Sequence, residues 1–297
     1  MDEISLKSRA KINITLDVVR KREDGYHDLS MIMQTVNLYD MIYIRKMRAQ
    51  GIKLTTNLRW LPSDEKNIVY QAVKLFKETY NIDTGISVKL NKKIPVAAGL
   101  AGGSSNAAAT LIGMNYLFET GLSNEELMKL GVKLGADVPY CILGGTALAE
   151  GIGEILTPLA PIPESYVLIA KPKINISTVS VFKQVDVAKI DRHPDNDKVI
   201  RAIENGDLDA ISKNMYNVLE EITSKNYPIV GTIKKTMLEH GAKGAIMSGS
   251  GPTVFGIYES KSQARKAAYK LKIDYLVGDV FITTMYNRKE GEKGYER

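Results

Sequence analysis

The stretch at residues 95–109 constrains the fold of this chain more than any other. It reads PVAAGLAGGSSNAAA, in which a loop rich in glycine and serine leads directly into an alanine-rich run with high helix propensity. Glycine lets the backbone come close to a ligand and adopt positive φ angles. The helix that follows presents unpaired N–H groups and the positive end of its dipole at the same place. The stretch therefore predicts an anion site, most often a phosphate site, at the start of a helix.

A second interpretation of this loop stays open. No Gly-Lys-Ser/Thr sequence follows it, so it is not a Walker A motif, and it lacks the spacing of the dinucleotide fingerprint and the catalytic-loop signatures of protein kinases. The alternative is a tight turn in which Ser104 or Ser105 caps the helix. The loop by itself does not decide between a phosphate site and a capped turn.

The cysteine content indicates the kind of compartment in which the protein works. Cys141 is the only cysteine, so no internal disulfide can form, and a reducing, cytoplasmic location is expected. Its neighbours Tyr140 and Ile142 favour a small core residue over a nucleophile. Residues 1–6 carry charges in place of an apolar run, so we expect no signal peptide.

Charge patterning argues against a membrane or nucleic-acid partner. Residues 94–118 contain no charged side chain, which is long enough for a membrane span. Pro95, Asn106 and the loop serines lie at the centre of this segment and fit hydrocarbon poorly, so we reject a span. The net charge of +6 favours anionic ligands. Basic residues are scattered and rarely interleaved with aromatic ones, so nucleic acid is not the expected partner.

Hydrophobic periodicity predicts a mixture of strands and helices. The clearest strand lies at residues 11–18, where apolar residues at even positions alternate with polar ones. Lys11 and Asn13 therefore point toward its polar side, and Asp24-Gly25 signals a hairpin turn. Further strands are predicted at residues 26–28, 41–45, 52–54, 86–90, 146–149, 166–170, 254–258 and 275–284, and helices at 64–80, 105–118, 123–135, 261–270 and through much of 178–240.

The order of these elements predicts the fold class. Strands and helices do not alternate regularly, so we predict an α+β fold with mixed or antiparallel sheets covered by helices. Pro158, Pro161 and Pro163 mark the expected boundary between two lobes, residues 1–158 and residues 159–297.

Several features together are typical of phosphoryl transfer. A second loop of glycine and serine lies at residues 248–253, Lys11 stands on the polar face of an early strand, and Asp137 follows the end of a predicted helix. Phosphoryl transfer needs the phosphates held, the developing charge balanced and the acceptor hydroxyl positioned for in-line attack.

Three segments resemble the motifs of the GHMP kinases, in the same order and over nearly the whole chain. They are AKINI at residues 10–14, PVAAGLAGGSS at residues 95–105 and SGSGPT at residues 248–253. The resemblance implies a two-lobed kinase fold in which ATP and a small-molecule substrate meet between the lobes.

Two more segments resemble one branch of that family. REDGYHDL at residues 22–29 and ADVP at residues 136–139 are similar to segments of the kinases that act on 4-diphosphocytidyl-2-C-methyl-D-erythritol. The resemblance implies ATP-dependent phosphorylation of the 2-hydroxyl of this cytidine-diphosphate-linked alcohol, in the non-mevalonate pathway to isoprenoid precursors.

The resemblance implies catalytic roles for two charged residues. Asp137 would accept the proton of the substrate hydroxyl. Lys11 would lie beside it, hold the carboxylate ionised and offset charge in the transition state. From the residues alone, Asp137 fits equally a helix N-cap followed by Pro139, and Lys11 fits a solvated strand lysine.

The resemblance also implies two sets of binding residues. The nucleotide-binding set comprises Pro95, Gly99, Leu100, Ala101, Gly102, Gly103, Ser104, Ser105, Asn106, Asn67 and Lys92. The substrate-binding set comprises Asn13, Tyr26, His27, Thr178, Phe182, Ser248, Gly249 and Ser250. Within the second set, His27 would contact cytosine while Tyr26 and Phe182 stack on its ring. The structural alternatives are a helix cap for Asn67, a surface lysine for Lys92 and core packing for Phe182.

The expected cofactors are ATP and Mg²⁺. One of the loop serines is an available magnesium ligand, but the sequence identifies no metal site, and no cluster of Cys and His suggests zinc.

Two other functions are kept as alternatives. The first is another GHMP kinase, acting on mevalonate, homoserine or a sugar, which the Gly25-Tyr26-His27 segment argues against. The second is a non-catalytic, basic protein that binds nucleic acid, which predicts salt-dependent binding and no ATP turnover. The sequence leaves the oligomeric state open, a homodimer included.

Overall fold

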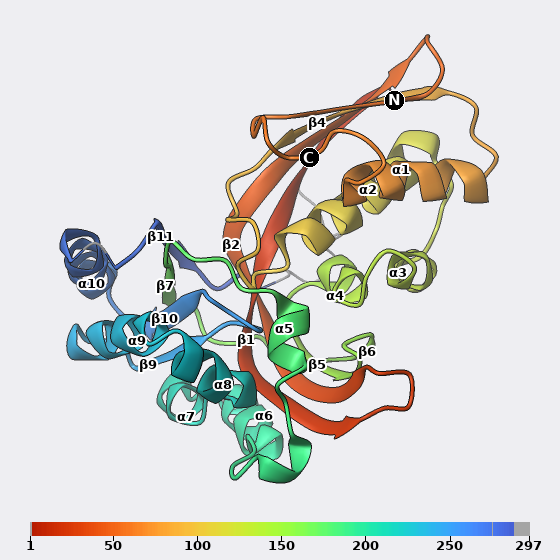
Figure 1. Cartoon of the computed structure of the whole chain (residues 1–297). Helices are drawn as coiled ribbons and strands as arrows, with labels where there is room; N and C mark the ends of the chain where they lie inside the picture. Colours follow the sequence, from red (N-terminus) through yellow and green to blue (C-terminus); the bar gives the residue numbers. More distant parts are fainter. Residues whose placement is uncertain (1, 275, 288–297) are drawn as a thin grey trace.

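A long antiparallel hairpin runs through the molecule (Figure 1). The computed structural model describes residues 2–274 and 276–287, and in it β1 (Glu3–Lys21) pairs with β2 (His27–Met47) along nearly its whole length. The predicted turn joins the two strands, and Gly25 there adopts a φ of 85°. This left-handed conformation explains why the turn needs a glycine.

The strands form two sheets. The first has the order β3-β4-β2-β1-β8, with β5 paired to β2 and β6 to β5, and the second, fully antiparallel, has the order β11-β7-β10-β9. The bounds are β3 (Ile52–Thr56), β4 (Gly85–Asn91), β5 (Thr146–Gly151), β6 (Ile155–Pro158), β7 (Tyr166–Lys171), β8 (Tyr216–Asn217), β9 (Gly244–Met247), β10 (Val254–Tyr258) and β11 (Asp279–Thr284).

Most predicted strands are confirmed, with four differences. The first strand is longer than the predicted residues 11–18, since β1 begins at Glu3. The strand predicted at residues 41–45 is part of β2, because the hairpin continues without a break. The closing strand begins at Asp279, and Tyr275 lies outside the described residues. The short strands β6, β8 and β9 were not predicted, because two to four residues give too little periodicity to detect.

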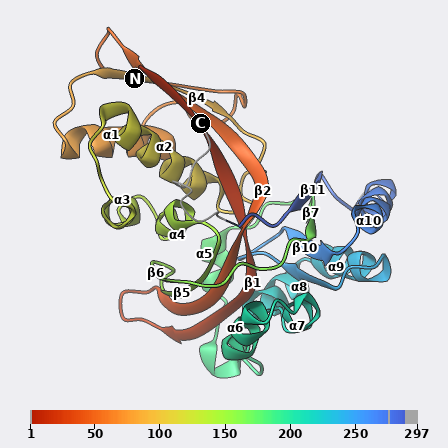
Figure 2. The same ribbon diagram turned by 180° about the vertical axis from the view of Figure 1, so that it is seen from behind.

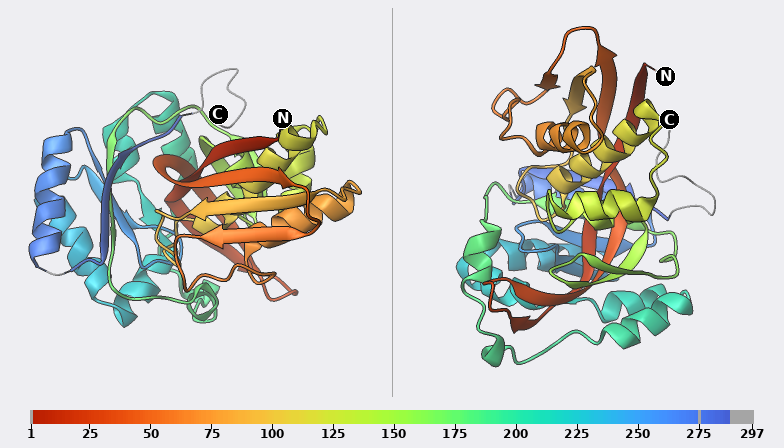
Figure 3. Two further views of the ribbon diagram at one scale, coloured as in Figure 1. Left: turned by 90° about the horizontal axis from the view of Figure 1, so that it is seen from above. Right: turned by 90° about the vertical axis from the view of Figure 1, so that its right-hand side faces the viewer.

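Helices cover both sheets. Figures 2 and 3 show α1 and α2 against the first sheet with α3 and α4 packed beside α2, and α9 and α10 on the outer side of the second sheet. The bounds are α1 (Ile68–Thr79), α2 (Gly102–Phe118), α3 (Asn124–Val132), α4 (Val138–Leu143), α5 (Thr178–Phe182), α6 (Asn196–Glu204), α7 (Leu208–Lys213), α8 (Val218–Asn226), α9 (Ile229–Glu239) and α10 (Lys261–Ile273), with a 3₁₀ turn at Val187–Lys189. The capping box that starts α3 is present as predicted, with Ser123 and Glu126 bonded reciprocally.

The uncharged segment identified in the sequence is a core helix. Every residue of α2 from Ser105 to Asn115 is buried, since the helix packs against α1, α4 and the β1–β2 hairpin. A helix that is apolar all round belongs in a core. Within the described residues, no helix is long and apolar enough to cross a membrane.

The centre of β1 is buried on both faces, so the expectation of a solvated polar face is wrong. Ile12 packs in the core between the two sheets, while Lys11 on the opposite face is only 5% exposed. A register shift between Asn13 and Thr15 then exchanges the faces, so that Leu16 lines the same cavity as Lys11. Bulges near functional sites re-aim side chains in this way.

The α+β fold with two helix-covered sheets is as predicted. The first sheet nevertheless takes strands from both predicted lobes, because β8 pairs with Thr15 and Leu16 of β1. The boundary between residues 158 and 159 stays a prediction. The outer ends of the two predicted lobes, residue 1 and residues 288–297, lie outside the described part of the chain.

Candidate active site

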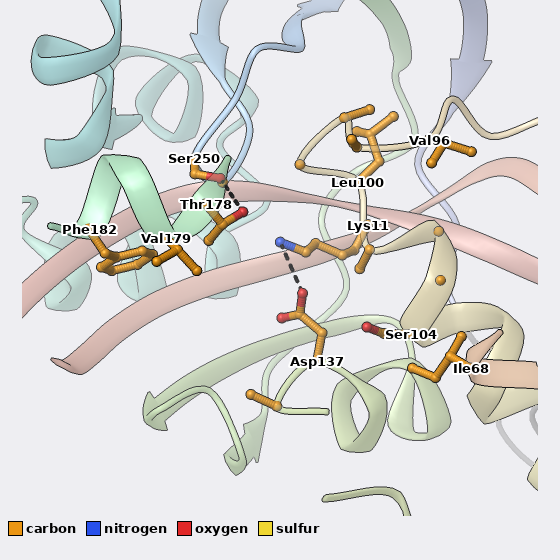
Figure 4. Close-up of a pocket in the computed structure, with 18 of the residues that line it drawn as sticks. Lys11, Ile68, Val96, Leu100, Ser104, Asp137, Thr178, Val179, Phe182 and Ser250 are labelled. Atoms are coloured by element: carbon orange, nitrogen blue, oxygen red, sulfur yellow. Dashed lines mark hydrogen bonds and ion pairs between the residues drawn. The ribbon is translucent and has the colours of Figure 1, made fainter. Parts of the chain in front are cut away.

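A cavity of about 990 Å³ opens beside the centre of β1 (Figure 4). Its walls come from the β1–β2 hairpin, the loop before α2, the start of α4, the helix α5 and the loop between β9 and β10. The cavity therefore collects segments that are far apart in the sequence. Most of the predicted site residues line it: Lys11, Tyr26, His27, Asn67, Lys92, Pro95, Gly99, Leu100, Ala101, Gly102, Gly103, Ser104, Asn106, Asp137, Thr178, Phe182, Gly249 and Ser250.

The first glycine loop directs the start of α2 into this cavity. Ala97, Gly99 and Ala101 have φ angles of 51°, 71° and 52°, so the loop changes direction repeatedly. Loops of this kind and helix N-termini both present backbone N–H groups to anions. The loop thus has the geometry that the predicted phosphate site requires.

The alternative interpretation of the loop, a turn capped by serine, is wrong. Ala101 occupies the N-cap position of α2 and makes no side-chain cap hydrogen bond. Ser104 lies inside the first turn and lines the cavity. Ser105 points the other way, and its hydroxyl donates to the carbonyl oxygen of Arg9 at 2.6 Å, so this residue does not reach the cavity.

Gly102 and Gly103 are glycines for different reasons. A Cβ atom on Gly102 would lie 2.9 Å from Cγ2 of Ile94 and 3.1 Å from Nζ of Lys92, so packing excludes a side chain there. A Cβ atom on Gly103 would meet only Cγ2 of Ile68, at 3.8 Å. The room at Gly103 opens to the cavity, so its missing side chain leaves space for a ligand.

The two glycine loops are in direct contact. A Cβ atom on Gly99 would lie 2.2 Å from the carbonyl oxygen of Ser248, so no other residue fits. The Ser248 hydroxyl donates to the carbonyl oxygen of Gly99 at 2.9 Å. Ser248, predicted to bind substrate, therefore has a structural role in joining the loops. Asn217 donates to the carbonyl oxygens of Met247 and Gly249, both at 2.8 Å. Sequence reasoning missed Asn217, because an asparagine at the start of a helix signals only a cap.

Lys92 is not the surface lysine of the structural alternative. Its side chain is 4% exposed, pairs with the carboxylate of Asp40 and donates to Oδ1 of Asn106 at 3.0 Å. Asp40 is fully buried and also accepts from the backbone N–H groups of Lys93 and Ile94 at 2.6 and 2.8 Å. The pair fixes the backbone just before the first glycine loop.

Asp40 is a second residue that sequence reasoning missed, although a signal exists. Its neighbours on the same face of β2, Leu38 and Ile42, are buried. A carboxylate within an apolar stripe of a strand needs a buried partner, because an unpaired buried charge is very costly.

Lys11 and Asp137 lie together on the cavity wall (Figure 4). The Lys11 ammonium is 3.9 Å from Oδ2 of Asp137 and donates to Oδ1 of Asn13 at 2.8 Å. Asn13 is fully buried and holds Lys11 without lining the cavity itself. Lys11 is therefore not a solvated strand lysine.

Asp137 stands at the N-cap position of α4, but its carboxylate makes no cap hydrogen bond. The side chain is about one-third exposed, at 34%, and faces the cavity. The capping alternative is wrong, and the carboxylate is left available to a ligand. One turn later, burial raises the pKa of the Cys141 thiol, as expected of an unreactive core cysteine.

The far end of the cavity is aromatic. The rings of His27 and Phe182 lie 5.4 Å apart, centroid to centroid, with their planes at 34°. Nε2 of His27 is buried and has no hydrogen-bond partner among the described residues. Because the His27 ring lines the cavity, this nitrogen is a candidate to bond a ligand there. Tyr26, 61% exposed, lines the cavity beside them.

The environment of His27 keeps its imidazole neutral. Burial lowers its pKa, and the charge of Lys21, its cross-strand partner, lowers it further. A neutral imidazole offers one donor and one acceptor, which suits the edge of a polar ring.

Two more predicted residues have structural roles. The Asn67 side chain accepts from the N–H of Val69 at 2.9 Å and donates to the carbonyl oxygen of Pro62 at 2.7 Å. Asn67 is therefore a helix cap, which was the structural alternative to nucleotide binding. It still lines the cavity. Thr178 of α5 bonds Ser250 of the second glycine loop at 2.9 Å, which joins two walls of the cavity.

The residues fit a magnesium ion that arrives with a nucleotide. The described residues contain no group of three or more His, Cys, Asp or Glu that could hold a metal. Magnesium in phosphate sites takes one or two carboxylates and completes its shell with phosphates and water. The Asp137 carboxylate and the Ser104 hydroxyl line the same cavity as the start of α2, and they provide donors of this kind.

Comparisons with known proteins agree with this geometry. Two family models match the chain, the GHMP kinases N terminal domain at residues 67–145 and the GHMP kinases C terminal at residues 199–276. A 4-diphosphocytidyl-2-C-methyl-D-erythritol kinase of Lachnoclostridium phytofermentans is 52% identical over 97% of this chain and 99% of its own length. The enzyme of that name from Clostridium perfringens is 50% identical over 96% of this chain and 99% of its own length.

Solved structures give the same picture. A crystal structure of a 4-(cytidine 5'-diphospho)-2C-methyl-D-erythritol kinase superposes with a TM-score of 0.81 at 30% identity, covering 95% of this chain and 99% of that one. A homoserine kinase from Cytophaga hutchinsonii reaches a TM-score of 0.78 at 23% identity, covering 96% of this chain and 95% of that one. The second likeness concerns the fold alone.

We predict that Gly103→Val weakens ATP binding at least about tenfold, a change of about 1.4 kcal/mol. The branched side chain would occupy the space at the start of α2 without clashing with the protein. Calorimetric titration with ATP and a thermal melt check this, and the melting temperature should change little. Gly102→Val is the comparison, since its clash with Ile94 should lower the melting temperature as well. Unchanged ATP affinity in Gly103→Val would contradict a phosphate site at this turn.

We also predict that His27 makes the protein less stable in acid. Because the folded pKa lies below the unfolded value of about 6.5, the unfolded chain takes up the proton first. The stability due to neutral His27 is complete above pH 6.5 and is lost as the pH falls toward the folded pKa. Melting temperatures of wild type and His27→Gln, measured from pH 7.5 to 5, should show a larger acid loss in the wild type. Parallel curves would contradict the lowered pKa.

Proposed function

This chain belongs to the GHMP kinase family, among the 4-diphosphocytidyl-2-C-methyl-D-erythritol kinases, and we propose that Asp137 and Lys11 catalyse transfer of the γ-phosphoryl group from ATP to the 2-hydroxyl of the substrate. The chain is an ATP-dependent kinase of the non-mevalonate isoprenoid pathway. One observation carries the proposed roles. The Asp137 carboxylate, free of capping bonds, faces a cavity that also receives the start of α2 and the buried Lys11 ammonium.

The nucleotide phosphates bind at the first glycine loop. The N–H groups of the first turn of α2 have no partner within the helix and meet the positive end of its dipole. The open face at Gly103 leaves room for a phosphate to approach them. This arrangement holds the triphosphate and leaves its terminal group toward Asp137.

The transfer uses the two charged residues at the cavity centre. Asp137 takes the proton from the 2-hydroxyl as the oxygen bonds to the γ-phosphorus and the bond to the leaving ADP oxygen breaks. The Lys11 ammonium, 3.9 Å away, offsets negative charge on the transferred group. Asn13 fixes the lysine through its 2.8 Å hydrogen bond.

Magnesium supplies charge neutralisation of the nucleotide phosphates when it is bound. Ser104 is the residue of this chain that would hold it, together with the phosphates themselves.

The cytidine part of the substrate fits the aromatic end of the cavity. The unpartnered Nε2 of His27 would hydrogen-bond the edge of the cytosine ring. Tyr26 and Phe182 offer faces on which a pyrimidine stacks. These features support recognition of the base and leave the alcohol toward Asp137.

The alternatives are now less well supported. Relatives near 50% identity carry one enzyme name, which disfavours a mevalonate, homoserine or sugar substrate. Membership in a kinase family disfavours a non-catalytic nucleic-acid-binding protein. A homodimer stays a prediction.

We predict that Asp137→Asn lowers kcat about 10²–10⁴-fold, the range expected of a lost general base. Steady-state kinetics measures the loss, and calorimetry with ATP should show little change in affinity. Asp207→Asn is the matched control, because Asp207 caps α7 through a 2.9 Å bond to the N–H of Ala210. A kcat within about threefold of wild type in Asp137→Asn would leave this residue without a chemical role.

We predict that the wild type phosphorylates the cytidylylated alcohol and uses bare methylerythritol phosphate with a kcat/KM lower by about 10² or more. A site built around hydrogen bonds to a ring strongly rejects an acceptor that lacks the ring. His27→Ala should lower kcat/KM for the cytidylylated acceptor alone. His240→Ala is the control, since the His240 ring bonds the carbonyl oxygen of Thr236 near the end of α9 and does not line the cavity. Equal use of both acceptors by the wild type would refute base recognition.

A further inference from the structure

A buried lysine outside the reaction centre has no assigned role. Lys171 ends β7, a central strand of the second sheet, and is 8% exposed. Among the described residues its ammonium forms no ion pair with a carboxylate. A buried cation is costly unless oxygen atoms replace its water.

Oxygen atoms from three of the next four residues supply that replacement. The Lys171 ammonium donates to the carbonyl oxygens of Pro172 at 3.4 Å and Ile174 at 3.0 Å, and to Oδ1 of Asn175 at 3.3 Å. A lysine ammonium is a compact charge with three donors, so it can gather three oxygens around one point. The segment at residues 172–175 thus wraps around the ammonium group of Lys171.

This segment has no regular secondary structure and leads directly into α5. The helix has only five residues, Thr178–Phe182, which is too short to be stable alone. Its position depends on what anchors it. Ile176 and Val181 are buried in the core, and Lys171 fixes the chain just before them.

Residues of α5 contribute to the wall of the cavity. Thr178 bonds Ser250 of the second glycine loop, and Phe182 packs against the ring of His27. A displacement of α5 would therefore act directly on the base end of the cavity, and would reach the first glycine loop only through the second.

We propose that Lys171 is a positioning residue, whose ammonium folds residues 172–175 and so places α5 for the cytidine part of the substrate. This inference rests on the proposed function for its effect on kinetics. Its structural part, the ordering of α5 by a buried cation, does not depend on the reaction.

The test replaces Lys171 with methionine, which keeps most of the side-chain volume and removes the charge. We expect KM for the cytidylylated alcohol to rise about tenfold, as suits the loss of hydrogen bonds to a charged group, with KM for ATP within about twofold of wild type. Lys173→Met is the matched control, since Lys173 is an exposed lysine of the same segment. An equal rise in both KM values, or none, would overturn the proposal.

A double-mutant cycle distinguishes positioning from general destabilisation. If Lys171 acts through α5, Lys171→Met should add little to the KM of a Phe182→Ala variant, because its target wall is already gone. Fully additive effects would count against the proposal.

A second measurement does not depend on catalysis. Hydrogen–deuterium exchange of the ligand-free protein should speed up at residues 176–184 in Lys171→Met and stay unchanged in α2. Unchanged exchange at 176–184 would refute the positioning role. Failure of the wild type to phosphorylate the cytidylylated alcohol would instead refute the proposed function.

A milder variant covers the case in which Lys171→Met does not fold. Asn175 is exposed, and Asn175→Ala removes one of the three oxygens. It should raise KM for the alcohol about threefold and speed exchange at the same residues. Wild-type values of both quantities in Asn175→Ala would overturn the proposal.

Discussion

The active site depends on the contact between its two glycine loops. One loop precedes α2 and the other joins β9 to β10, and at Gly99 the approach leaves no space for a Cβ atom. The Ser248 hydroxyl and the Asn217 amide then hold the loops in one arrangement. Because the first loop leads into α2 and the second joins two strands of the second sheet, this contact fixes the proposed phosphate site relative to the proposed substrate wall.

Much of the fold could be predicted because its signals are local. Alternating residues predicted the centre of β1, the Asp24-Gly25 pair predicted the turn, and the capping box predicted the start of α3. Lys11 and Asp137 lie together, as the resemblance to the GHMP kinases implied, while the anion site at the first glycine loop stays a prediction. Each of the strand, turn and capping signals lies within a few positions of the element that it predicts.

The rest could not be predicted because it depends on contacts distant in sequence. The burial of Lys11 follows from a strand covered on both faces, and periodicity alone suggested solvent. Ser105 lies in the motif but turns toward the carbonyl oxygen of Arg9, because successive helix residues point in different directions. Asp40 and Lys92 find each other across 52 positions, which no local pattern records.

The pairing of β1 with β8 bears on how the chain is made. Leu16 lies beside Asn217, so the first strand leaves the ribosome about 200 residues before its last partner. At 5–20 residues per second, that interval is roughly 10–40 s. During this time the apolar face that later meets the second sheet is uncovered, and non-local pairing of this kind also folds slowly. The strand that unites the two halves of the site therefore keeps an apolar face open to other chains until its later partners have been made.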